Sequence, residues 1–154
     1  MRLHRRGTEE AETAEKTTAT TSYYSNQTTS RDEAGVYRTS YVDGLGRLIQ
    51  VAETGIGAST SYQYDALDDL TTVTPASGTG RSFGYSSLKR LTSATNPETG
   101  PTTPVTYTYD RNGNLQTRTA GGVTTTYGYD ELDELTGRTY SDSTPAATYT
   151  YNKG

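Results

Sequence analysis

The chain has 154 residues, of which only 30% are hydrophobic, and this composition argues against a deep aliphatic core. Its aromatic residues are 14 tyrosines and one phenylalanine; tyrosine, with a large ring and a polar tip, suits a thin layer close to water. The net charge of −4 argues against nucleic acid as a partner, the absence of cysteine excludes disulfides and thiolate metal sites, and no apolar run approaches the ~20 residues of a membrane span.

Residues 1–22 are polar and are expected to form a mobile tail ahead of the folded array, residues 23–154. The tail contains His4, the only histidine of the chain. Its basic start is not followed by an apolar segment, so no secretory signal peptide is visible. Asn26, followed by Gln27 and Thr28, matches the acceptor sequence for N-glycosylation and is a possible glycosylation site.

From Val36 onward, short strand-forming runs alternate with turn residues, and a degenerate first repeat is expected to begin at Tyr23. The expected strands are 48–53, 60–64, 70–74, 81–85, 91–95, 105–109, 115–119, 123–129, 135–140 and 147–151. All five prolines fall in turns or at strand ends, where a missing N–H costs least. No helix of two turns or more is expected after the tail.

One pattern recurs at the same phase through this region. Its copies are SYVDGLGRL (40–48), YQYDALDDL (62–70), FGYSSLKRL (83–91), YTYDRNGNL (107–115) and YGYDELDEL (127–135), and a sixth copy, YTYNKG (149–154), is truncated. The second aromatic position recurs every 20 to 24 residues. A period of this size is typical of repeat proteins, in which each unit stacks on the next. The sequence therefore predicts an all-β fold, a repetitive antiparallel β-hairpin meander that forms an open, solenoid-like sheet.

The pattern also has a physical interpretation. The two aromatic residues share one face of a strand and are expected to stack against the pair of the next hairpin. The following Asp can accept backbone N–H bonds two or three residues on, as an Asx-turn, while Gly46 and Gly113 permit positive φ and a leucine starts the next strand. The structural repeat positions are Tyr62, Tyr64, Asp65, Leu70, Phe83, Tyr85, Leu91, Tyr107, Tyr109, Asp110, Gly113, Leu115, Tyr127, Tyr129, Asp130, Leu135, Tyr149 and Tyr151.

These residues do not favour catalysis, because a lone histidine and no cysteine leave no assisted nucleophile. No catalytic residue and no cofactor is expected. Acidic turns such as the one with Asp65, Asp68 and Asp69 could collect Ca²⁺, but their spacing does not match known calcium loops, so turn capping is the favoured role and no metal site is expected. A surface of Tyr, Thr, Asn and Asp leaves glycan binding open as a secondary role.

The motifs YTYDRNGNL and GLGRL resemble the YD repeat of rearrangement-hotspot (Rhs) proteins, which also occurs in the C components of insecticidal toxin complexes and in animal teneurins. The resemblance covers residues 36–154. It implies a continuous β-ribbon that spirals into a hollow shell, which in bacterial members encloses a toxic C-terminal polypeptide. The chain departs from that pattern because it is too short to close a shell, stops inside a repeat and contains no DPxGxxDG-type self-cleavage stretch. The resemblance therefore carries the fold, but neither encapsulation nor self-cleavage.

Two functions from different classes follow from the sequence. The first is a non-catalytic structural protein, either a segment of an Rhs-like shell or a self-assembling extracellular or surface fibre, and the second is a carbohydrate- or protein-binding module at the cell surface. Self-association is expected head to tail, with the strand at 147–151 meeting the first hairpin of another copy; the rival expectation is that the chain is part of a longer Rhs protein. Neighbouring motif turns are expected to match in charge, with Asp69 meeting Arg90.

Overall fold

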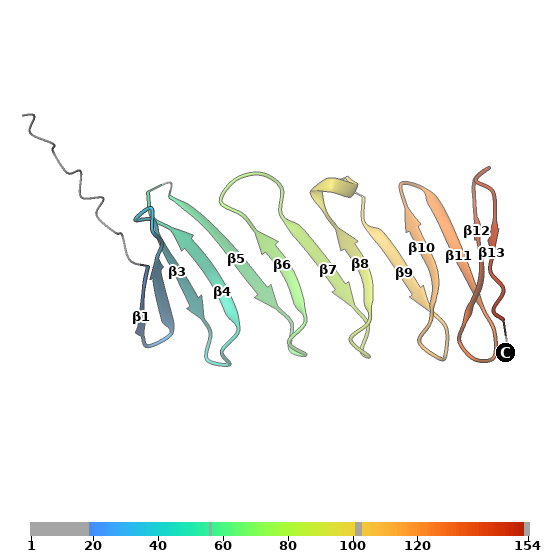
Figure 1. Cartoon of the computed structure of the whole chain (residues 1–154), viewed down its shortest axis with the longest axis horizontal. Coiled ribbons are helices and arrows are strands. Elements are labelled where there is room, and N and C mark those ends of the chain that lie inside the picture. Colours follow the sequence, from blue (N-terminus) through green and yellow to red (C-terminus); the bar gives the residue numbers. More distant parts are fainter. Residues whose placement is uncertain (1–18, 56, 101–102, 153–154) are drawn as a thin grey trace, which may run out of the picture.

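The computed structural model describes residues 19–55, 57–100 and 103–152, which form one antiparallel sheet of thirteen strands in sequence order (Figure 1). The strands are β1 (Thr20–Tyr24), β2 (Gln27–Arg31), β3 (Tyr37–Val42), β4 (Leu48–Glu53), β5 (Ala58–Tyr64), β6 (Leu70–Thr74), β7 (Arg81–Tyr85), β8 (Leu91–Thr95), β9 (Val105–Tyr109), β10 (Leu115–Ala120), β11 (Val123–Tyr129), β12 (Leu135–Tyr140) and β13 (Ala147–Thr148). The only helix among the described residues is a three-residue 3-10 turn, η1 (Pro97–Thr99), between β8 and β9.

Each copy of the motif forms a turn after which the register shifts by one residue. Tyr64 lies opposite Leu70, whereas Gln63 lies opposite Thr72, so Thr71 is an extra residue in β6. The same shift follows the other four motif turns, at β3–β4, β7–β8, β9–β10 and β11–β12. Because a bulge of this kind increases the local twist, its repetition along one rim curves the whole sheet.

The register gives the sheet two different faces. On the aromatic face, the eight aromatic residues of the motifs lie opposite leucines and other residues of the return strands; these aromatic residues are Tyr62, Tyr64, Phe83, Tyr85, Tyr107, Tyr109, Tyr127 and Tyr129. On the hydroxyl face, serine and threonine recur across neighbouring strands, as in the pairs Thr72 with Ser82 and Ser93 with Thr106. Two side chains of these rows bond directly, with Thr108 Oγ1 and Thr117 Oγ1 2.6 Å apart.

The sheet has very little core. The only buried apolar residues of the described ranges are Ala94 and Val105, which lie opposite each other on the aromatic face, and no large side chain is fully buried. Among the described residues, no second layer of strands or helices covers either face, and the tyrosines of the motifs are half-buried among their neighbours. The aliphatic core that the composition argues against is therefore absent from this part of the chain.

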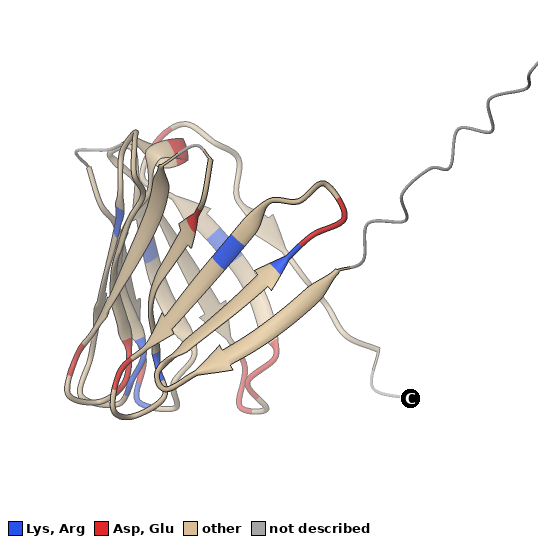
Figure 2. Cartoon of the chain, turned by 90° about the vertical axis from the view of Figure 1, so that its left-hand side faces the viewer, with Lys and Arg blue, Asp and Glu red and all other residues tan. Residues whose placement is uncertain are grey.

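The single layer is curved rather than flat. Seen from the β1 end, the middle strands lie on one side and both ends of the ribbon bend toward the other (Figure 2). The motif turns form one rim, which is the lower rim in Figure 1, and the connections between repeats form the other. Acidic residues lie mainly at these rims, whereas basic residues also lie within the strands (Figure 2).

The predicted all-β antiparallel meander is confirmed, and most strand boundaries agree with the sequence prediction. β10 ends one residue later than expected, at Ala120, and three further differences occur. The degenerate first repeat expected from Tyr23 is present as β1 and β2, but β1 starts at Thr20, inside the expected tail, whose residues 1–18 lie outside the described ranges. β5 begins at Ala58 rather than at residue 60, and β13 ends at Thr148 rather than at 151 because only Gly137 and Arg138 of β12 pair with it.

Candidate functional site

The most regular feature of the molecule is the row of five motif turns, each closed by the side chain that follows the second aromatic position. Asp65 Oδ1 accepts the N–H groups of Leu67 and Asp69 at 2.8 and 3.0 Å. The equivalent side chains Asp43, Ser86, Asp110 and Asp130 accept the same two bonds, from residues two and four positions on. The predicted Asx-turns are thus confirmed; a donor at the fourth position is present in every turn, and Asp110 also accepts the N–H of Gly113 at the third position, at 2.8 Å.

One residue of every motif turn adopts the left-handed conformation. Gly46 and Gly113 have φ of 82° and 99°, as predicted for these glycines. In the other three turns the same place is held by Asp68, Lys89 and Asp133, with φ between 60° and 68°. A non-glycine residue in this region costs about 1 kcal/mol or more, so the surrounding turn bonds over-determine the conformation.

Arg47 joins the first motif turn to the second. Its Nε donates to Asp43 Oδ2 at 2.7 Å and its Nη1 to Asp68 Oδ1 at 2.6 Å, while the guanidinium carbon lies 5.1 Å from the centre of the Tyr64 ring. The pKa of Asp43 is lowered, chiefly by the backbone N–H bond from Arg47 and also by its guanidinium. The pKa of Arg47 is raised in turn, first by its bond to Asp43. The bond to Asp68 and the contact with the Tyr64 ring cross from one repeat to the next, whereas the bond to Asp43 lies within the first turn.

Arg90 occupies the same place in the third turn and reaches forward to the fourth. Its Nη1 donates to the Asp110 carbonyl oxygen at 3.4 Å and its guanidinium carbon lies 4.9 Å from the Tyr109 ring centre. Ser86 replaces the aspartate of the other turns, and Arg90 Nε is buried without a hydrogen-bond partner. The arginine is therefore placed by its ring and carbonyl contacts, without the carboxylate that Arg47 has.

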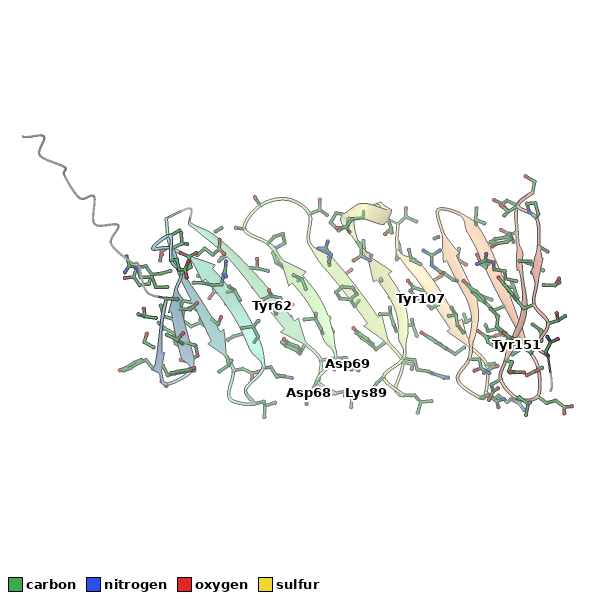
Figure 3. The ribbon with its side chains drawn as sticks, in the orientation of Figure 1. Tyr62, Asp68, Asp69, Lys89, Tyr107 and Tyr151 are labelled. Carbon is green, nitrogen blue, oxygen red and sulfur yellow. The ribbon has the colours of Figure 1, made fainter. Side chains whose placement is uncertain are left out.

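The expected charge matching between turns is found, although not between the expected atoms. Asp69 pairs with Lys89 at 3.7 Å (Figure 3). Arg90 does not take this place, because its guanidinium lies over the ring of Tyr109. The link between the fourth and fifth turns uses amides instead, since Asn114 Nδ2 donates to Asp133 Oδ1 at 2.6 Å. Each motif turn thus contacts the next through side chains of different chemistry.

A second set of contacts ties four tyrosines, each at the second aromatic position of its motif, to the preceding repeat. Tyr109 Oη donates to the Leu91 carbonyl oxygen at 2.8 Å. Tyr64, Tyr129 and Tyr151 make the equivalent bonds to Leu48, Leu115 and Leu135 at 2.9 to 3.0 Å. Every such bond closes the open end of a hairpin between two repeats. The pKa of Tyr85 is raised, by burial first and then by the charges of Asp69 and Asp65, and the pKa of Tyr129 is also raised, first by burial.

This arrangement can be compared with known families. The RHS repeat matches residues 42–79, 64–101, 85–123 and 109–145. The chain belongs to the RHS repeat family. The four matches begin at Val42, Tyr64, Tyr85 and Tyr109, which are the second aromatic positions of the motifs and therefore repeat at the phase read from the sequence. A search of curated proteins finds no match to the chain.

Within the RHS repeats, the first aromatic residue of each motif does not lie against another aromatic strand as predicted. Its direct partner is the third residue after the motif leucine, because a return strand separates successive aromatic strands. That partner is Val73, Ala94, Arg118 and Arg138 in successive repeats. Sequence reasoning missed this position, although its spacing from the leucine is constant. The expected ring stacking between hairpins is thereby corrected to pairing with aliphatic or guanidinium groups.

The tips of the RHS motif turns carry exposed leucines that the sequence analysis also overlooked. Leu45 is 74% exposed, and the equivalent side chains Leu67, Leu88 and Leu132 are exposed at the same rim. The signal was present in GLG, ALD, SLK and ELD, where leucine lies two residues after the capping residue. Asn112 interrupts the row in the fourth turn. These leucines do not pack within the sheet.

The remaining candidate sites lie apart from the motif turns or outside the described residues. Asn26 lies exposed in the β1–β2 turn and its Nδ2 donates to the Val42 carbonyl oxygen at 3.3 Å, whereas His4 lies outside the described residues. Across residues 19–55, 57–100 and 103–152, no group of three or more acidic or histidine side chains is arranged to hold a metal ion. The same residues include no helix with the length and apolarity needed to cross a membrane. A hollow of about 270 Å³ lies where Gly128 faces Gly137 across β11 and β12.

Proposed function

We propose that the chain is a non-catalytic structural protein, a segment of the wall of an Rhs-like shell located outside the cell or at its surface. The observation that carries this proposal is the build of the sheet: one layer in which each repeat is fastened to the next by a rim contact and, in most repeats, a tyrosine bond. Such a layer is extended by adding repeats without changing the existing ones. Membership of the RHS repeat family supports the same assignment.

The chemistry of the rims supports a structural rather than catalytic role. The carboxylates of the motif turns are engaged by backbone N–H groups of their own turn, as the five bonds of Asp43 and Asp110 illustrate. Bonding of this kind outweighs partial burial and holds the pKa of Asp110 below its usual value, so this group is not suited to take up protons near neutral pH. The aspartates are therefore used to close turns.

A surface fibre is the second form that this structural role could take. Support for it comes from the outer edges of β1 and β13, neither of which pairs with another strand of the described residues. In a fibre these edges meet head to tail between copies, whereas in a wall they meet neighbouring repeats of a longer chain. Both forms use the same ribbon.

Binding of a glycan or protein at the cell surface is the alternative function. It is favoured by Tyr107 and Tyr127, which are half-buried on the aromatic face and do not share the hydroxyl-to-carbonyl bonds of Tyr109 and Tyr129. A ring with a free polar tip is suited to stacking against a sugar. Replacement of Tyr127 by Ala should then reduce binding on a glycan array, with Tyr24→Ala as a control at the far end of the ribbon.

Imaging of the purified chain by negative-stain electron microscopy tests the structural proposal. The wall-segment account expects short, open, curved ribbons of one or two chain lengths. Fibres many ribbons long would favour the surface fibre over the wall segment, and compact globular particles would contradict both forms. The non-catalytic assignment is tested separately. An enzymatic activity of the chain that Asp110→Asn abolishes in a folded variant would overturn it.

A further inference from the structure

The strand β1 is the least protected part of the sheet. All five of its residues are exposed, and Tyr23 and Tyr24 are each 80% exposed. Its sequence, TTSYY, contains no charge and no proline, and its pairing with β2 has no bulge. Natural edge strands use charges, prolines and bulges to avoid pairing with other chains. Since β1 has none of these, and among the described residues pairs only with β2, its outer edge is open to a partner. It lies at one end of the ribbon (Figure 1).

The neighbouring hydrogen bonds show which backbone groups of β1 face outward. Gln27 lies opposite Tyr41, and the Val42 N–H donates to the Asn26 carbonyl oxygen at 2.9 Å. This bond marks Gln27 and Tyr41 as a non-hydrogen-bonded pair. The N–H and C=O of Gln27 therefore point the other way, toward Tyr24 of β1.

Because backbone groups alternate in direction along a strand, the orientation of Tyr24 fixes the rest of β1. The N–H and C=O groups of Ser22 and Thr20 point toward β2, as those of Tyr24 do. The groups of Thr21 and Tyr23 point to the free edge. Two residues, each with one donor and one acceptor, are thus available for another strand.

The strand count limits how a second copy can meet these groups. In an antiparallel sheet of thirteen strands, β1 and β13 run in the same direction. A copy added by translation would pair β13 with β1 in parallel, and a copy turned over to restore antiparallel pairing would exchange the aromatic and hydroxyl faces. A two-fold axis perpendicular to the sheet avoids both problems, because it brings β1 against β1 with the faces continuous.

We infer that the free chain forms a two-fold dimer in which β1 pairs antiparallel with β1 of a second copy, centred on Ser22. In this register Thr21 lies opposite Tyr23 of the second copy, and Thr20 opposite Tyr24, at both ends of the pair. The outward groups of Thr21 and Tyr23 then bond each other, while the two Ser22 residues form a non-hydrogen-bonded pair. Four pairs of tyrosine with threonine result, a favourable combination across strands.

This register is the one that uses all five residues of β1, since a shift by two positions leaves two of them unpaired on each copy. The other edge offers less, because β13 has only two residues in the strand. The inference does not rest on the wall-segment function. A longer chain that covers β1 with its own repeat would prevent the dimer without changing the ribbon.

Single cysteines test the register, because the native chain contains none. In the inferred dimer the Cα atoms of the two Ser22 residues are about 4.5 Å apart, within the range that a disulfide bridges. Thr20 lies opposite Tyr24 of the second copy, so the two Thr20 residues are separated by four residues along the strands, about 13 Å. Under mild oxidation Ser22→Cys should therefore form a disulfide dimer at least about tenfold faster than the matched control Thr20→Cys. Equal rates, or no dimer from either variant, would overturn the inference.

Sedimentation velocity of the native chain over a range of concentrations provides the second test. A monomer–dimer equilibrium is expected, and Thr21→Pro should abolish it because proline removes an outward N–H while leaving the β1–β2 bonds intact. Thr148→Pro is the matched control at the other edge, where the neighbouring Tyr149 N–H bonds Thr136 and the Thr148 N–H faces outward. This control should still dimerise. A strictly monomeric native chain, species larger than dimers, or loss of dimer in the control would each contradict a β1–β1 interface.

Discussion

The first and third motif turns place an arginine at the same position and give it different surroundings. Arg47 bonds the carboxylate of its own turn, Asp43, and that of the next turn, Asp68. Arg90 follows Ser86, has a buried Nε without a partner, and lies over the Tyr109 ring at a distance similar to that of Arg47 over Tyr64. The backbone of the two turns is closed by the same pattern of bonds.

The comparison separates two roles of the capping residue. Closing the turn requires only an oxygen that accepts N–H bonds, and the Ser86 hydroxyl does this at 3.3 Å. The Asp43 carboxylate also bonds the arginine of its own turn, which the Ser86 hydroxyl does not, yet Arg90 still lies over the ring of Tyr109. The ring of the following tyrosine is therefore sufficient to place the guanidinium, while the ion pair adds stability between repeats.

Acidification should have the largest effect on the stability of the chain, because it acts on the turns closed by aspartate and not on the turn closed by Ser86. The pKa values of Asp43 and Asp110 lie below the ordinary value of 3.8, so the folded chain binds fewer protons than the unfolded chain near that pH. The stability they contribute is present above about pH 4 and is lost as the pH falls through the lowered pKa values. The Tm should fall between pH 5 and pH 2 by more than any substitution below causes. A Tm independent of pH in this range would contradict the role of the aspartates.

Removal of one capping carboxylate should have the next largest effect. Asp110→Ala removes the acceptor for three backbone N–H groups and should lower the Tm by about 4 to 8 °C. The matched variant Ser86→Ala loses two longer bonds and should lower the Tm by about 2 °C or less. Thermal unfolding followed by circular dichroism measures both. Equal losses would mean that the hydroxyl and the carboxylate cap equally well.

The tyrosine bonds between repeats should contribute less than an aspartate cap. Tyr109→Phe removes the Oη bond to the Leu91 carbonyl oxygen and keeps the ring under Arg90, so a Tm decrease of about 2 to 4 °C is expected. Tyr23→Phe, at an exposed ring, is the control and should leave the Tm unchanged in dilute solution. If both variants unfold at the native Tm, the bond does not stabilise the array.

Restoring the missing carboxylate should give the smallest effect, with the opposite sign. Ser86→Asp places an acceptor near Arg90 Nε and should raise the Tm by about 1 to 3 °C. The gain should disappear in a background with Arg90→Met, which removes the unpaired donor. A gain that persists without Arg90 would show that better turn capping, not the ion pair, is responsible.

The sequence was sufficient for the parts of the fold that repeat. The aromatic, Asp, Gly and Leu positions each have one local role, so the period predicted strands, motif turns and the left-handed glycines at Gly46 and Gly113. Positive φ at Lys89 was not predicted, because the residue type does not favour it and the turn bonds impose it. The early start of β5 and the short β13 were missed because pairing with neighbours, not composition, sets those boundaries.

The contacts between repeats were harder to predict because they depend on which strands are adjacent. The expectation that aromatic pairs stack on each other neglected the return strand, so the pairing of Tyr107 with Arg118 was missed. The charge contact was predicted between the correct turns but with the wrong basic residue. Lys89, not Arg90, pairs with Asp69, because the Arg90 guanidinium lies over the Tyr109 ring. Outward hydrogen-bonding groups on β1 follow only from the register.

Small-angle X-ray scattering of the dilute chain tests most directly whether the protein is a single-layer ribbon without a core. The account expects an elongated particle whose thickness corresponds to one sheet with its side chains, about 10 Å, and whose length follows the thirteen strands. A compact particle about 20 Å thick, as two packed sheets would give, would contradict it.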